Sequence, residues 1–275
     1  MDLLKLFNYH FIQHAFLAAL LMSVTCGIVG TYIVSRRMVF ISGGITHASF
    51  GGVGMGYFFG FPPLAGAAIF AIIAALTTEH LTRKKVLRND SIIAILWSLG
   101  MALGIIFVYL TPGYAPNLMS FLFGSIITVT NTDLWLMLAL AMVVSGFFTM
   151  FYRPILFVSF DEQFARTRRI PVMLLNYLLI ILVALTIVLS IRIAGIILVL
   201  SILTIPQNIS NIFTNRFSYI IISSIILGIV ASVLGLVISY YIDIPSGATI
   251  IFTLVVMYLT ARFIKVVIFA RKSQN

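Results

Sequence analysis

The chain has 275 residues, of which 61% are hydrophobic and only 9% are charged. This composition excludes a soluble globular domain, because almost the whole length must lie in lipid. The formal net charge of +10 does not indicate a nucleic-acid-binding protein, since the basic residues sit in short loops between apolar runs. The single Cys26 lies in an apolar stretch, which excludes disulfides and a redox motif. We expect one polytopic domain over 1–275.

Apolar runs of membrane-crossing length recur along the chain, where one span needs about 20 residues. In chain order they cover 12–34, 40–60, 62–81, 91–111, 132–152, 172–192, 195–212, 217–241 and 246–268. The weakest are the glycine-rich second run and the seventh run, which Pro206 interrupts. The segment 118–130 is apolar but short, and we expect a re-entrant or interfacial helix there. The pattern predicts an all-α membrane protein with eight to nine transmembrane helices.

The basic residues predict which loops face the cytosol. If Arg36 and Arg37 are placed inside and the spans alternate, all 17 lysines and arginines except Lys5 and Arg192 fall on the cytosolic side. This distribution predicts an odd number of spans in a multi-pass protein of the cell membrane. The N-terminus would lie outside and the C-terminus in the cytosol.

One loop on the predicted cytosolic side is long enough to hold a helix of its own. Ser159 is a suitable N-cap, Glu162 three residues later completes a capping box, and Pro171 ends the helical segment. We therefore expect a short amphipathic helix over about 159–170. Its apolar residues, such as Phe164, could rest on lipid headgroups. They could instead dock the helix to a cytosolic partner.

A histidine lies inside the glycine-rich second run. A titratable ring at membrane depth is costly, so His47 is a candidate functional residue. Small residues recur around it every four positions, and on a helix they form one stripe that another backbone can approach closely. These residues are Gly44, Ala48, Gly52, Gly56 and Gly60. His47 could contact a transported ion, or it could only hydrogen-bond to a neighbouring helix.

Three motifs succeed one another in a fixed order along the chain. They cover residues 34–52, which include His47, residues 159–166 (Ser-Phe-Asp-Glu-Gln-Phe-Ala-Arg) and residues 239–249 (Ser-Tyr-Tyr-Ile-Asp-Ile-Pro-Ser-Gly-Ala-Thr). Each motif alone is weak evidence, but their order and spacing agree over the full chain. Together they resemble the membrane-spanning permease subunits of ABC transporters for zinc, manganese and iron.

The resemblance implies a permease, not an enzyme, that moves zinc or manganese into the cytoplasm. It also implies three partners: a cytosolic ATP-binding subunit, an extracytoplasmic metal-binding protein and a second permease copy. Nucleic acid is not expected as a partner. The sequence has no Gly-x-x-x-x-Gly-Lys-Ser/Thr phosphate loop, so ATP would bind to the partner and no cofactor to this chain. The family's coupling helix would dock the ATPase through Asp161, Glu162, Phe164 and Ala165.

The same resemblance assigns the metal path to His47 and Asp243. Family members commonly carry an Asp four residues before the histidine, where this chain has Gly43. They also commonly carry a His four residues before the later Asp, where this chain has Ser239. Two ligands are too few for a tight site, so they would form a loose relay that a dimer axis doubles or water completes. Asp243 could instead be a solvated loop residue or a helix cap.

Polar side chains accompany the break in the seventh run. Pro206 is followed by Gln207 and Asn208. Free carbonyls and amides at a helix break can line a water-filled cavity, so Gln207 and Asn208 are candidate cavity-lining residues. Ser239, in the next run, is a third candidate. The alternative for the two amides is hydrogen bonding between helices.

Other classes of protein stay open at this stage. The same ATP-driven design could carry a metal chelate of the iron or cobalamin type, although a wide path does not suit a constriction at His47. An ion-driven secondary transporter usually has acids within the membrane, and Asp243 lies only at its edge. An integral-membrane enzyme would need paired buried carboxylates or a nucleophile with a base, and the sequence offers neither.

Overall fold

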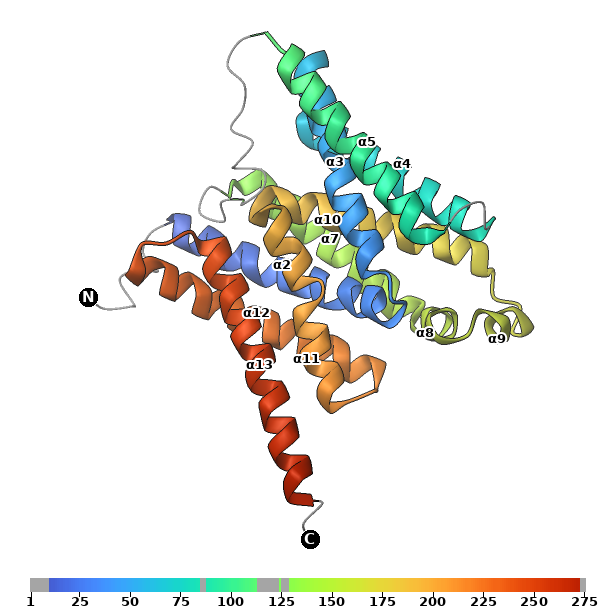
Figure 1. Ribbon diagram of the computed structural model, residues 1–275, viewed down its shortest axis with the longest axis vertical. Coiled ribbons are helices and arrows are strands. Elements are labelled where there is room, and N and C mark those ends of the chain that lie inside the picture. The colour runs from blue at the N-terminus through green and yellow to red at the C-terminus, as the bar shows by residue number, and fades with distance from the viewer. Residues whose placement is uncertain (1–9, 85–87, 113–123, 125–128, 273–275) are drawn as a thin grey trace. The chain divides into compact units, whose positions relative to one another are not determined.

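The computed structural model describes residues 10–84, 88–112, 124 and 129–272, and the elements in these ranges are all helices (Figure 1). In chain order they are α2 (His10–Ser35), α3 (Val39–Phe59), α4 (Pro63–Arg83), α5 (Asn89–Leu110), α7 (Asn131–Met150), α8 (Tyr152–Phe160), α9 (Glu162–Thr167), α10 (Val172–Ile202), α11 (Ile205–Phe213), α12 (Phe217–Ile242) and α13 (Ser246–Lys272). The prediction of an all-α protein is confirmed.

Eight of the nine predicted spans lie largely within one helix each, whereas the run 195–212 is divided between the end of α10 and α11. Within the described ranges, seven segments are long and apolar enough to cross a membrane. The glycine-rich α3 is not among them, and α10 and α11 count as one segment, Val172–Phe213. The predicted number of eight to nine spans and the sides of the two termini therefore stay predictions. The expected re-entrant segment 118–130 falls mostly outside the described residues.

The chain divides into two compact units, which we describe separately. The first unit comprises Met1–Val34, Phe123–Ser145 and Ile193–Asn275, and the second comprises Ser35–Leu122 and Gly146–Arg192. The first therefore contains most of α2 together with α11, α12 and α13. The second contains α3, α4, α5, α8 and α9. The single permease domain expected over 1–275 stays a prediction.

In the second unit, α3 packs tightly against both α4 and α5. A Cβ atom added to Gly100 of α5 would lie 2.5 Å from the Cα atom of Ala48, and one added to Gly54 would lie 2.5 Å from the carbonyl oxygen of Gly104. On the α4 side, a Cβ at Gly52 would overlap the backbone of Gly66. Only glycine permits such contacts, because real Cβ atoms do not come this close to a backbone. The close backbone approach that the small-residue stripe predicts is present.

In the first unit, α12 and α13 are joined by a short turn and pack against each other near that turn (Figure 1). Gly235 of α12 makes this possible, since a Cβ there would lie 2.6 Å from the Cα atom of Ile250. The hydroxyl of Thr249 also donates a hydrogen bond of 2.9 Å to the Gly235 carbonyl. Further back in the chain, α10 kinks at Gly195, whose φ of 76° favours glycine. The start of α11 at Ile205, next to Pro206, agrees with the predicted interruption, whereas the kink at Gly195 was not predicted.

Candidate functional site

His47 lies in α3 and stacks on Trp97 of α5 within the second unit. The two ring centroids are 4.0 Å apart and the ring planes differ by 6°. The contact depends on the close packing of α3 and α5, since the glycines between these helices bring their backbones together. Offset stacking of aromatic rings contributes about 0.5–1.5 kcal/mol beyond the buried area. Trp97 therefore holds the imidazole in one orientation.

The Nδ1 atom of His47 is buried and has no hydrogen-bond partner. Most buried polar atoms in proteins are paired, so an unpaired ring nitrogen needs an explanation. A neutral imidazole nitrogen that bears a lone pair is a common metal ligand. A role in hydrogen bonding to a neighbouring helix, the alternative for His47, is not seen at this atom. The ring is thus oriented by stacking, while Nδ1 is buried without a hydrogen-bond partner.

The surroundings of His47 do not form a complete metal site. Across the ranges that the structure describes, no three His, Cys, Asp or Glu side chains come together in a way that could hold a metal ion. His47 belongs to the second unit and Asp243 to the first. The arrangement within the second unit fits a weak contact with a passing ion, since a transporter must release what it binds.

Asp243 is the C-cap residue of α12. Its backbone is in the left-handed region, with φ 56° and ψ 45°, and its N–H donates to the carbonyl of Ser239. Asp tolerates this conformation better than most residues. The hydroxyl of Ser239 donates a bond of 2.6 Å to the Ile244 carbonyl, so Ser239 closes the same turn. The carboxylate of Asp243 is exposed, which leaves it able to attract cations at this end of the helix pair.

Gln207 and Asn208 differ in their surroundings. Gln207 is fully buried, and its Nε2 donates to the carbonyls of Cys26 in α2 at 3.0 Å and of Ile202 at 3.2 Å. It thus forms the interhelical hydrogen bond that the sequence left open as an alternative to lining a cavity. Asn208 is exposed, and its amide donates to the Thr204 carbonyl at 2.8 Å.

The loop between α7 and α10 forms two helices instead of one. The expected single helix over 159–170, capped by Ser159, is wrong in this respect. The chain is already helical before Ser159, whose hydroxyl donates to the Ile155 carbonyl at 2.6 Å inside α8. The break falls at the extended residue Asp161, whose carboxylate accepts a bond of 2.9 Å from the Phe164 N–H and caps α9. Phe164 is 40% exposed, whereas Ala165 is buried.

Glu162 is the centre of a polar cluster that Arg36, Arg83 and Asn176 complete. Its Oε1 atom accepts hydrogen bonds from Arg36 at 2.7 Å and from Asn176 at 2.9 Å, and the Arg83 guanidinium lies 3.8 Å away. Partial burial by itself raises the pKa of Glu162. The hydrogen bonds from Arg36 and Asn176 and the charges of Arg36 and Arg83 outweigh this effect and lower the pKa below its usual value. The carboxyl is therefore ionised at neutral pH.

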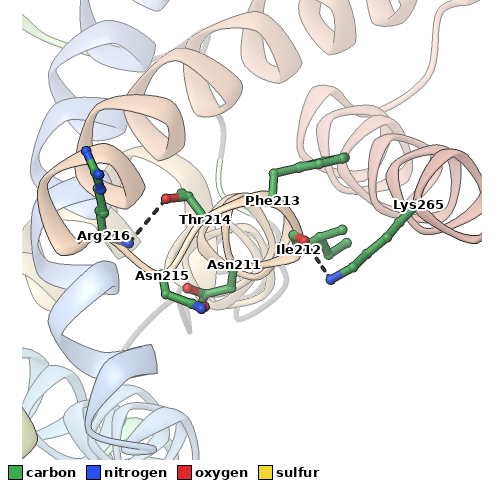
Figure 2. Close-up of a pocket in the computed structure, with 7 residues that line it drawn as sticks. All are labelled: Asn211, Ile212, Phe213, Thr214, Asn215, Arg216 and Lys265. Carbon is green, nitrogen blue, oxygen red and sulfur yellow. Dashed lines mark hydrogen bonds between the residues drawn. The ribbon is translucent and has the colours of Figure 1, made fainter. Parts of the chain in front are cut away.

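A hollow of about 580 Å³ lies where the end of α11, the start of α12 and α13 meet (Figure 2). Figure 2 shows Lys265 reaching from α13 to the carbonyl of Ile212, to which its ammonium donates at 2.7 Å. The other polar side chains that line the hollow are those of Asn211, Thr214, Asn215 and Arg216. Its walls contain two positive charges and no acid or histidine, so the hollow does not attract a metal cation.

Three features of these sites were missed by sequence reasoning. Trp97 resembles any other apolar residue of a span, and only the crossing of α3 and α5 places it on His47. Arg36 resembles a topology-setting charge, and nothing in its position predicts a contact with Glu162, 126 residues away. Asp133 is buried at the start of α7, where it accepts from the hydroxyl of Thr130 at 2.7 Å. The Thr-x-x-Asp spacing is a cap signal that could have been recognised.

The fold and these sites define a multi-pass membrane protein with a few isolated polar groups on its apolar helices. Residues 8–265 match the ABC 3 transport family. The chain is 42% identical to an uncharacterized membrane protein of Synechocystis over 92% of its own length and 90% of that protein. It is 32% identical to the manganese transport system membrane protein MntC of Halalkalibacterium halodurans, over 94% and 89% of the two chains.

A solved structure is similar over nearly the whole fold. PsaBC from Streptococcus pneumoniae, in complex with Fab, superposes with a TM-score of 0.84 at 30% identity, covering 93% of this chain and 92% of the other. The chain therefore belongs to the ABC 3 transport family, as the three motifs predict. It is a membrane permease subunit and not itself an enzyme. Membership in an ABC family implies an ATP-hydrolysing partner and a substrate-binding protein.

Proposed function

We propose that this permease imports manganese and that His47 is the residue of α3 that contacts the ion. The observation that carries the proposal is the buried, unpaired Nδ1 atom of His47, in a chain that matches a manganese transport protein over nearly its full length. Imidazole binds manganese as well as zinc, with modest selectivity. A single imidazole also suits rapid release, because several strong ligands would trap the ion.

Asp243 would add a second, separate contact. It is exposed at the end of α12, and the predicted topology puts that end outside. An acid at this position would raise the local concentration of the cation. The missing carboxylate at Gly43 means that α3 supplies only one ligand, so further ligands would come from water or from a second permease copy. We propose a homodimer for this reason.

The partner ATPase would dock on the outer face of the segment that includes α9. The side chains of Phe160 and Phe164 are 63% and 40% exposed there, and Asp161 lies between them in the chain. Exposed aromatic residues of this kind are common anchors at protein interfaces. ATP would be bound by that partner, and an external binding protein would deliver the ion.

The test is uptake of radiolabelled manganese by the permease, reconstituted with its ATPase subunit in liposomes. His47→Phe keeps a ring that can stack on Trp97 but removes both nitrogens. We expect ATP-dependent uptake to fall at least about ten-fold in this variant, the effect of losing roughly 1.4 kcal/mol of ion contact. His10→Phe, which makes the same change at an exposed histidine at the start of α2, is the matched control and should transport normally.

Three results would each contradict a part of the proposal. If His47→Phe transports as well as the unmodified protein, His47 has only a packing role. If uptake proceeds on an ion gradient without ATP, the transporter belongs to the secondary class. Parallel assays with zinc identify the preferred metal, and a preference for zinc would refute the assignment of manganese as cargo.

A further inference from the structure

The side chain of Glu162 faces the permease itself. One carboxylate oxygen contacts three separate parts of the second unit: Arg36 just after α2, Asn176 near the start of α10, and Arg83 in the last turn of α4. Glu162 is partly buried, whereas Phe164, two residues further on, is exposed. The helix α9 thus has an outer face that can meet a partner and an inner face that is bound to its own chain.

Arg36 connects to the loop segment through two hydrogen bonds, one to α8 and one to α9. One of its guanidinium nitrogens, Nη2, donates to Glu162 at 2.7 Å, while the other, Nη1, donates to the carbonyl of Val158 at 2.8 Å. Val158 lies in the last turn of α8, where carbonyls lack helical partners. Arg36 therefore spans the break at Asp161 and holds α8 and α9 to a single point. A planar guanidinium can make both bonds at once, which an ammonium cannot do with the same geometry.

This point is also where the helix that carries His47 begins. Arg36 is followed by Arg37, whose φ of 57° turns the chain, and α3 starts at Val39. His47 stands eight residues into α3, about 12 Å along the helix axis. A displacement of α9 would therefore act on the turn before α3 through hydrogen bonds to charged groups, which are among the stronger contacts in proteins.

The cluster is anchored on α4 as well. Glu79 accepts a bond of 2.6 Å from Arg83 within the same helix, which orients the guanidinium. One turn away, the ring of His80 lies 3.3 Å from the hydroxyl of Tyr177 in α10. If Glu162 were absent, the guanidinium groups of Arg36 and Arg83 would lose the acid between them. The ends of α4 and α10 and the turn before α3 therefore meet at one carboxylate.

We propose that Glu162 is the positioning residue that transmits movement of the ATPase-docking helix α9 to the turn before α3 and to the ends of α4 and α10. This inference rests on the proposed function, because it presumes a partner that docks on α9. It separates two roles within one short helix. Phe164 holds the partner, whereas Glu162 couples the partner to the helices that carry the ion path.

The experiment compares Glu162→Ala with Phe164→Ala in the full permease–ATPase complex. Three quantities are measured: co-purification of the ATPase, its rate of ATP hydrolysis, and manganese uptake per ATP hydrolysed in liposomes. We expect Glu162→Ala to keep the ATPase bound and active but to lower the uptake per ATP about ten-fold, within the usual range of coupling between sites. Phe164→Ala should instead weaken co-purification. A merely structural role for Glu162 would not change the uptake per ATP in an assembled complex.

Two outcomes for Glu162→Ala would overturn the inference. If Glu162→Ala loses the ATPase as Phe164→Ala does, Glu162 is a docking residue. If Glu162→Ala keeps the normal uptake per ATP, the cluster transmits nothing. Should Glu162→Ala fail to assemble in the membrane, Asn176→Ala removes one hydrogen bond to the same carboxylate and keeps its charge. A smaller decrease in uptake per ATP is then expected, and an unchanged value refutes the link.

A second measurement does not depend on the cargo. In the unmodified complex, addition of ATP should change hydrogen exchange in the turn 35–39, and Glu162→Ala should remove this response. An identical response in the variant would refute the link. If the unmodified complex shows the exchange response but no uptake of manganese, the proposed cargo is wrong while the link stands.

Discussion

The contact between α3 and α5 can be tested by adding one methyl group. In Gly100→Ala, the new Cβ would lie 2.5 Å from the Cα atom, 2.6 Å from the oxygen and 2.9 Å from the carbonyl carbon of Ala48. Ordinary contacts begin at 3.4 Å. All three atoms belong to the backbone, so no side chain can rotate away. The two helices must therefore move apart by about 1 Å, a typical consequence of overpacking.

Two opposing effects set the size of the change. Overpacking costs about 1–3 kcal/mol, while replacing glycine by alanine inside a helix gains about 0.5–1 kcal/mol. We expect a net loss of about 1–2 kcal/mol, because the overpacking term is larger. At about 2–4 °C per kcal/mol for a domain of this size, the unfolding temperature should fall by about 2–8 °C. The same displacement should loosen the stack of Trp97 on His47.

The assay is thermal unfolding of the purified protein in detergent, followed by fluorescence of the two tryptophans, Trp97 and Trp135. Gly146→Ala is the matched control, because a Cβ at Gly146 in α7 would meet nothing within 4 Å. This control should be neutral or slightly more stable, since only the helix-propensity gain applies. If Gly100→Ala unfolds at the same temperature as Gly146→Ala or higher, the close approach of α3 and α5 is not as we describe.

Two further predictions concern Glu162 and Gln207. Because the folded pKa of Glu162 is lowered, the stability that its ionised form contributes is complete above the usual value of 4.5 and is lost as the pH falls through the lowered pKa. The difference in unfolding temperature between the unmodified protein and Glu162→Gln should thus be constant from about pH 5 to 8 and shrink at lower pH; a difference that grows on acidification contradicts the sign of the shift. Gln207→Leu removes hydrogen bonds that contribute about 0.6 kcal/mol each between membrane helices, so transport should persist with a slightly lower unfolding temperature. Loss of manganese uptake at unchanged stability would instead identify Gln207 as a contact of the ion.

The helices could be predicted from the sequence because lipid imposes a simple requirement on the chain. A backbone in hydrocarbon must satisfy its own hydrogen bonds, so each apolar run of sufficient length becomes a helix. The expected 132–152 and 217–241 correspond closely to α7 (Asn131–Met150) and α12 (Phe217–Ile242). The broken seventh run also results from local chemistry, since proline interrupts a helix.

The loop before α10 was harder to predict because two caps compete there. Ser159 and Asp161 are both good N-cap residues, and the choice depends on where the preceding helix ends. Since α8 continues through Ser159, only Asp161 is left in an extended conformation that can cap α9. The helix α8 belongs to the same segment, but the residue at which it ends is decided by packing, and a local sequence pattern does not contain that information.

By itself, the sequence determined the class of protein and the positions of His47 and of the small residues around it. Those residues make close packing possible because they carry almost no side chain. Only the tertiary structure decided which helices use this possibility, and therefore that Trp97 covers His47. It also decided that Glu162 binds Arg36, a contact between residues 126 positions apart. Such contacts depend on how the helices cross, which the periodicity of a single segment does not encode.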